Sequence, residues 1–104
     1  MKWDNSKTEE LFEAILALKD TDEAKRFFRD LLTEAELIEF GNRWTAVRML
    51  DQNISYTTIR GKTGLSSATI ARISKWLREG KQGYRLMLDR LNSHHHTPAL
   101  LRKG

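Results

Sequence analysis

The sequence has 104 residues, with 18 Lys and Arg against 14 Asp and Glu, a formal net charge of +4, and no cysteine. This length suits one folded domain, which we expect to cover residues 1–104. The lack of cysteine excludes disulfides and thiolate metal sites and is typical of a reducing compartment, so we expect a cytoplasmic protein. We expect neither a membrane span nor a secretory signal, because no apolar run approaches roughly 20 residues.

The charge is distributed unevenly along the chain. Residues 1–32 hold six basic against eight acidic residues, and residues 33–54 hold two against four. Residues 55–93 instead hold eight basic residues against two acidic ones, a net charge of +6. A basic half joined to an acidic half favours a face that binds a polyanion. A basic surface that is only solvated has the same composition, so charge alone leaves both interpretations open.

Apolar residues recur with helical spacing, strand-like alternation is nearly absent, and the only proline is Pro98, so we predict an all-α protein. The first two predicted helices cover Ser6–Lys19 and Asp22–Leu32, and Asp20 and Thr21 separate them. The apolar residues that we expect them to bury are Leu11, Phe12, Ile15, Leu16, Leu18, Phe27, Phe28, Leu31 and Leu32.

A third predicted helix begins with the segment Thr33-Glu34-Ala35-Glu36 and reaches about Asp51. This segment has the pattern of a capping box, in which the Thr33 hydroxyl and the Glu36 carboxylate satisfy each other's free amide groups. A helix that is apolar on more than one side is normally covered by several neighbours. The apolar residues are Leu37, Phe40, Trp44, Val47 and Leu50 on one stripe, with Ile38 and Met49 outside it.

Three further helices complete a predicted six-helix subunit. After Asn53, a short helix begins at Ser55, and a turn at Gly64 leads to a helix over Ser67–Glu79 that Gly80 ends. The last helix covers Gln82–Asn92. We expect it to bury Tyr84, Met87, Leu88 and Leu91. Residues 94–104, which include three successive histidines, are expected to form a frayed, solvated tail.

Residues 55–79 have the pattern of a helix-turn-helix. Gly64 can adopt the positive φ that a tight turn between two helices needs. Ser66 and Ser67 can cap the second helix. Small outward residues let such a helix enter a major groove, where Arg72 can bond a guanine. The inward positions are Ile59, Leu65, Ile70, Ile73 and Leu77, and the outward ones are Ser67, Ala68, Thr69, Ala71, Arg72 and Lys75.

The stretch from about Leu31 to Leu91 resembles the tryptophan repressor superfamily, most closely the small Trp-repressor-related proteins of Gram-positive bacteria. The matching residues are Leu32-Thr33, Gly41-x-Arg43, Gly64, Ala68-Thr69-Ile70 and Arg72. The resemblance implies an intertwined, all-helical homodimer that places its helix-turn-helices in successive major grooves of double-stranded DNA. The DNA contacts implied by position are Tyr56, Thr57, Arg60, Ser67, Ala68, Thr69 and Arg72. Arg60 departs from the pattern, because such motifs commonly have a small residue there.

The family's corepressor pocket is matched only in part. By position, Arg43 and Arg72 correspond to the two arginines that hold tryptophan, and Thr33 to a residue at the mouth. Ile73 and Trp76 stand where the family has a glycine and a serine, and overpacking of this kind costs roughly 1–3 kcal/mol. We therefore expect these two side chains to fill the site, or Trp76 to be a core aromatic, so that tryptophan is not a corepressor. Another effector is left open.

Other chemistries find little support in the sequence. Successive histidines point in different directions on a helix and have no cysteine or nearby carboxylate to complete a metal site, so we expect no metal. No nucleophile-like trio and no glycine-rich loop is present, so we expect neither an enzyme nor a cofactor. Two functions from different classes remain. One is a sequence-specific DNA-binding transcriptional regulator, and the other is a helical protein-interaction adaptor that kept the fold but lost operator recognition.

Overall fold

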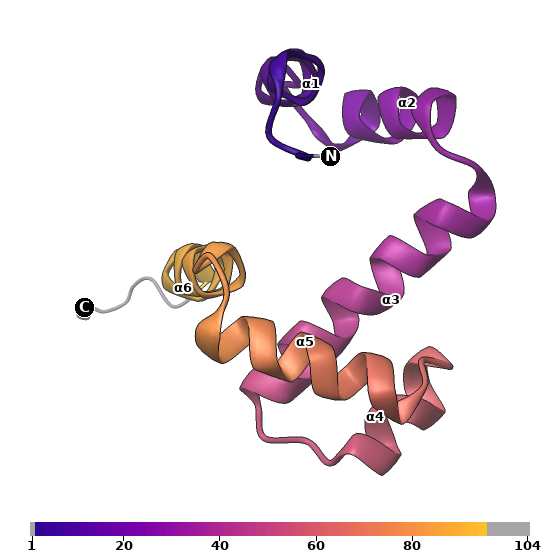
Figure 1. Cartoon of the computed structure of the whole chain (residues 1–104), viewed down its shortest axis with the longest axis vertical. Helices are drawn as coiled ribbons and strands as arrows, with labels where there is room; N and C mark the ends of the chain where they lie inside the picture. The colour runs from indigo at the N-terminus through magenta and orange to yellow at the C-terminus, as the bar shows by residue number, and fades with distance from the viewer. Residues whose placement is uncertain (1, 96–104) are drawn as a thin grey trace. The chain divides into compact units, whose positions relative to one another are not determined.

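The computed structural model describes residues 2–95, which form six α-helices and no strand within that range (Figure 1). The predicted all-α class is confirmed. None of the described helices is long and apolar enough to cross a bilayer. The contacts divide the chain into two compact units, one ending at Ile38 and the other beginning at Glu39. The helices are α1 (Ser6–Leu16), α2 (Thr21–Leu31), α3 (Glu34–Asp51), α4 (Tyr56–Thr63), α5 (Ser67–Glu79) and α6 (Gly83–His95).

Helix α1 begins as predicted but ends three residues early. Asn5 caps it, because its side-chain oxygen accepts hydrogen bonds from the amides of Lys7 and Thr8 at 2.9 and 3.1 Å. The predicted end at Lys19 is wrong. The Lys19 amide instead donates to the Glu23 carboxylate at 2.9 Å and so belongs to the entry into α2.

The first unit leaves much of its apolar surface open. No residue of α1 or α2 is fully buried, and Phe12, Leu16 and Leu31 are 44%, 84% and 47% exposed in the single chain. The predicted burial of these three side chains is therefore wrong for one copy of the chain. Phe27 and Phe28 are half-buried and contact each other edge to face, with ring centroids 5.4 Å apart.

The capping box at the start of α3 is present. The Glu36 amide donates to the Thr33 hydroxyl at 3.1 Å, and the Thr33 amide donates to the Glu36 carboxylate at 2.9 Å. At the other end of α3, Asn53 adopts a φ of 62°, a left-handed conformation that Asn tolerates better than most residues. The chain can therefore turn sharply there and enter α4.

The buried core of the second unit is formed by side chains of α3, α4, α5 and α6 and of the turn between α4 and α5. Ile59, Ile70 and Ile73 are at most 1% exposed, as the predicted inward pattern requires. Because these residues come from both helices and pack on α3 and α6, burying them fixes how α4 and α5 meet. The full cluster is Ala46, Val47, Ile59, Leu65, Ile70, Ile73, Leu77 and Leu88.

An ion pair joins α6 to the end of α3. An Arg85 guanidinium nitrogen lies 3.0 Å from an Asp51 carboxylate oxygen, and a second one lies 3.5 Å from Asp89. The hydrogen bond to Asp51 raises the pKa of Arg85 above its ordinary value. Since the two partners are 34 residues apart, this bond helps to hold α6 against the rest of the second unit.

Helix α6 differs from its prediction in length and in burial. It runs to His95, three residues beyond the predicted end at Asn92, and residues 96–104 of the predicted tail lie outside the described residues. Leu88 is buried as predicted, but Met87 and Leu91 are 39% and 37% exposed. Their predicted burial is wrong for a single copy, because only one side of α6 faces the core.

The turn between α4 and α5 generates a stability prediction. Gly64 has a φ of +75°, where an alanine costs about 1–2 kcal/mol, so Gly64→Ala should lower the free energy of unfolding by that amount. Gly61 lies inside α4 with open space around it, and Gly61→Ala should raise that free energy by about 0.5–1 kcal/mol. Urea unfolding followed by circular dichroism measures both. A Gly64→Ala variant as stable as Gly61→Ala would contradict the account of the turn.

Candidate nucleic-acid interface

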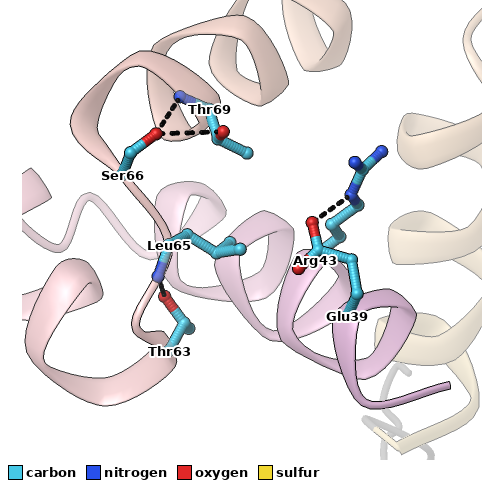
Figure 2. A network of polar contacts seen from close by, with 6 residues as sticks. All are labelled: Glu39, Arg43, Thr63, Leu65, Ser66 and Thr69. Atoms are coloured by element: carbon cyan, nitrogen blue, oxygen red, sulfur yellow. Dashed lines mark hydrogen bonds and ion pairs between the residues drawn. The ribbon is translucent and has the colours of Figure 1, made fainter. Parts of the chain in front are cut away.

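The turn between α4 and α5 is locked by the side chain of Thr63, which is 7% exposed. Its hydroxyl donates to the Ile59 carbonyl at 2.8 Å. It also accepts from the Leu65 amide at 3.2 Å, as Figure 2 shows. The Gly64 amide closes α4 by donating to the Arg60 carbonyl at 2.8 Å. Thr63 is a structural residue that was not predicted from the sequence. The pattern that could have predicted this role is a threonine directly before the turn glycine, because its hydroxyl can donate to the carbonyl four residues earlier.

Serines cap both helices of this pair. The Ser66 hydroxyl accepts from the Thr69 amide at 3.1 Å and donates to the Thr69 hydroxyl at 3.1 Å (Figure 2). Ser55 caps α4 in the same way by accepting from the Thr58 amide at 3.2 Å. The first turn of α5 is thereby fixed, and Ser67 stands exposed at its start.

The seven residues predicted to contact DNA all belong to α4 and α5. Six of them are exposed, and Thr69 is half-buried beside Ser66. These residues therefore lie on the outer surface of the α4–α5 pair, whereas other side chains of the same two helices are buried in the core. Those on α4 are Tyr56, Thr57 and Arg60, and those on α5 are Ser67, Ala68, Thr69 and Arg72.

Both helices of this pair carry exposed basic side chains. Within residues 2–95, Arg60, Lys62, Arg72 and Lys75 have no carboxylate at ion-pair distance. All four are exposed on α4 or α5. Unpaired positive charge on one surface creates a positive potential that attracts an anionic partner.

We call the surface formed by Tyr56, Thr57, Arg60, Ser67, Ala68, Thr69 and Arg72 the reading face.

Two of the residues predicted to line a ligand pocket have other partners. Thr33 is occupied with the cap of α3. The Arg43 Nε lies 3.0 Å from a carboxylate oxygen of Glu39, one turn earlier on α3 (Figure 2). A guanidinium that is already paired with a carboxylate has less charge left to offer a ligand's carboxylate.

The other three predicted pocket residues lie on α5. Ile73 is 1% exposed and belongs to the core of the second unit. Trp76 is 44% exposed, so in a single copy of the chain it does not belong to the buried core. The Arg72 guanidinium carbon lies 5.9 Å from the centroid of the Trp76 ring, within the range of a cation–π interaction.

A groove of about 890 Å³ lies beside Trp76. Neither Arg43 nor Arg72 lines it, and Trp76 is the only one of the five predicted pocket residues that does. The two arginines and this space therefore do not form the shared site that the sequence analysis considered. The groove is lined by Trp44, Lys75, Trp76, Glu79, Gly80, Lys81, Gly83, Tyr84 and Met87.

Comparison with known proteins places the chain in a family. Residues 6–92 match the model of the Trp repressor protein family. The chain is 41% identical over 83 residues to YerC of Bacillus subtilis (strain 168), whose function is uncharacterised, and the match covers 80% of each protein.

Solved structures agree with this assignment. A candidate Trp repressor from Staphylococcus aureus is 38% identical, with a TM-score of 0.79, and the match covers 85% of this chain and 88% of that one. A TrpR-like protein from Eubacterium eligens ATCC 27750 is 40% identical, with a TM-score of 0.82, and the match covers 86% and 92%. The six-helix fold, its sequence and its helix pair together show that this chain belongs to the Trp repressor family.

Proposed function

We propose that the protein is a sequence-specific transcriptional regulator that binds operator DNA as a homodimer in the cytoplasm. The observation that carries this proposal is the reading face, in which six of the seven side chains on α4 and α5 are exposed while Ile59 and Ile70 of the same two helices are fully buried. A face of this kind can enter a major groove without rearrangement, because its inner side already holds the two helices together.

In this proposal α5 is the recognition helix. Ala68 and Thr69 are small enough to bring the helix close to base edges, and Arg72, one turn further on, can donate two hydrogen bonds to a guanine. Tyr56, Thr57 and Arg60 on α4 bond the phosphate backbone and set the register of α5 on the duplex. The base contacts supply specificity, and the phosphate contacts supply most of the salt-dependent affinity.

Dimerisation is supported by apolar side chains that a single copy leaves open. Phe40 and Leu86 are each 52% exposed, and Met87 and Leu91 are more than a third exposed. These residues lie on α3 and α6, not on the reading face. A second copy is the partner that would cover such surfaces, and two-fold symmetry would place two copies of α5 one helical turn of DNA apart.

We further propose that tryptophan does not act as corepressor. Ile73 is packed in the core, Arg43 is paired with Glu39, and the guanidinium of Arg72 lies over the Trp76 ring. Each of these contacts is made by the chain itself. The helix pair is therefore held without a ligand, and operator binding should not depend on one.

The first test measures operator affinity and specificity. A duplex selected from random DNA should contain a palindrome, and Thr69→Ala and Arg72→Ala should each weaken binding to it by about 1–3 kcal/mol in fluorescence anisotropy. Arg26→Ala removes an exposed arginine from α2, far along the chain from the reading face, and should leave the affinity unchanged. Equal losses in the Arg26 and Arg72 variants would contradict specific reading by α5.

The same titrations repeated at several salt concentrations separate the regulator from an adaptor. A dimer that makes several phosphate contacts should lose on the order of 10³-fold in affinity between low and moderate salt. An adaptor that lost operator recognition would bind duplexes weakly, without a preferred sequence, and Thr69→Ala would not change its affinity.

The second test concerns the dimer. Leu86→Glu places a charge on the exposed apolar side of α6 and should shift the sedimentation equilibrium from dimer to monomer at micromolar concentration. Gln52→Glu adds the same charge at an exposed polar position after α3 and should leave the dimer intact. A wild-type protein that sediments as a monomer at all concentrations would overturn the proposed assembly.

The third test titrates the protein with L-tryptophan in a calorimeter. The expected result is no binding in the micromolar range, and operator affinity that is the same with and without tryptophan. Micromolar binding of tryptophan, or an operator affinity that rises when it is added, would refute the proposal that this chain works without that corepressor.

A further inference from the structure

Arg72 and Trp76 stand one turn apart on α5 and interact. The guanidinium carbon of Arg72 lies 5.9 Å from the ring centroid of Trp76. Residues four apart on a helix lie on the same side, so the contact is made within one rigid element. Trp76 is 44% exposed in the single chain and is not part of its buried core, so the ring is open to the Arg72 side chain.

The Trp76 ring is a different kind of partner from the carboxylates that pair with Arg43 and Arg85 in the second unit. Arg43 and Arg85 are paired with carboxylates, which occupy their donors and offset their charge. Arg72 has no carboxylate at ion-pair distance within residues 2–95. An aromatic ring attracts the cation but accepts few of its hydrogen bonds, so the donors of Arg72 stay available for a nucleic acid.

The backbone of Trp76 is held within α5. Its carbonyl accepts the Gly80 amide at 2.8 Å. Its neighbours Ile73 and Leu77 are buried in the core. The ring therefore stands at a fixed position of the helix, beside the long, flexible side chain of Arg72.

We propose that Trp76 is a positioning residue for DNA recognition, which holds the Arg72 guanidinium in its binding pose before the duplex arrives. This inference rests on the proposed function and adds a residue to it that need not touch DNA. Free arginine side chains lose rotamer freedom when they bind, and a side chain that is ordered in advance loses less. The stacked pose therefore raises affinity without a new contact to DNA.

Removing the Trp76 ring should weaken operator binding only moderately. A cation–π interaction at an exposed site, together with the ordering of one side chain, corresponds to a loss of about 3- to 10-fold in operator affinity when the ring is removed. Trp76→Leu removes the ring and keeps an apolar side chain that suits a helix. Trp76→Phe keeps a smaller ring and should retain most of the affinity.

A double-mutant cycle tests whether the effect of Trp76 passes through Arg72. Affinities for the selected duplex are measured at low salt for the wild type, Trp76→Leu, Arg72→Gln and the double variant. Trp76→Leu should weaken binding about 3- to 10-fold in the presence of Arg72 and less than 2-fold in its absence. An equal loss in both backgrounds would overturn the inference.

Arg78 supplies the matched control. It lies on the same helix, and its Nε donates to the Ser74 carbonyl at 3.3 Å rather than contacting the ring. Arg78→Gln removes the same charge as Arg72→Gln. The fold losses in operator affinity caused by Arg78→Gln and by Trp76→Leu should simply multiply in the double variant, which means that the two residues are not coupled. Coupling to Arg78 as strong as that to Arg72 would mean that Trp76→Leu disturbs α5 generally, and would overturn the inference.

The free protein gives an independent readout. In its NMR spectrum the Arg72 Hδ protons should be shifted upfield by the ring current of Trp76, and the shift should vanish in Trp76→Leu while the backbone spectrum of α5 is kept. Arg72 Hδ shifts that are the same in both proteins would overturn the inference even if operator binding is strong. A wild type that binds no duplex overturns the proposed function and this inference together, whereas tight binding without coupling overturns the inference alone.

Discussion

The arrangement of α4 and α5 depends on the burial of Ile59, Ile70 and Ile73. The turn between the two helices requires a residue that adopts a positive φ. Gly64 supplies that conformation, and the Thr63 hydroxyl bonds to both sides of the turn. Because three isoleucines are removed from water at this one place, packing sets the angle between the helices. The outward side of the pair then carries the exposed side chains to which the proposed function assigns DNA binding.

The distribution of charge follows from the same arrangement. Arginines that serve the fold, such as Arg43 and Arg85, are paired with carboxylates of their own chain. The arginines of the reading face, Arg60 and Arg72, have no such partner within the part of the chain that the structure describes. Under the proposed function this matters, since an internal ion pair would compete with phosphates and bases for each of these two guanidinium groups.

Local signals predicted most of the helices and the exposure of six of the seven residues of the reading face. The capping box at Thr33, the turn at Gly64 and the helix over Ser67–Glu79 depend on neighbouring residues and could be read from the sequence. The end of α1 was missed, because the amide of Lys19 bonds a side chain of the next helix. The exposure of Leu86, Met87 and Leu91 and the pairing of residues 51 and 85 depend on which elements meet in three dimensions, and no local pattern encodes that.

The most direct test of the central claim is a map of the DNA-bound surface on the protein. Backbone amide shifts should be recorded by NMR while the selected duplex is added. The account predicts the largest changes over residues 55–60 and 66–72, at the start of α4 and the first half of α5, with small changes along α6. Changes concentrated on α6 or in the first unit, with residues 66–72 unaffected, would contradict the claim that the α4–α5 pair reads DNA.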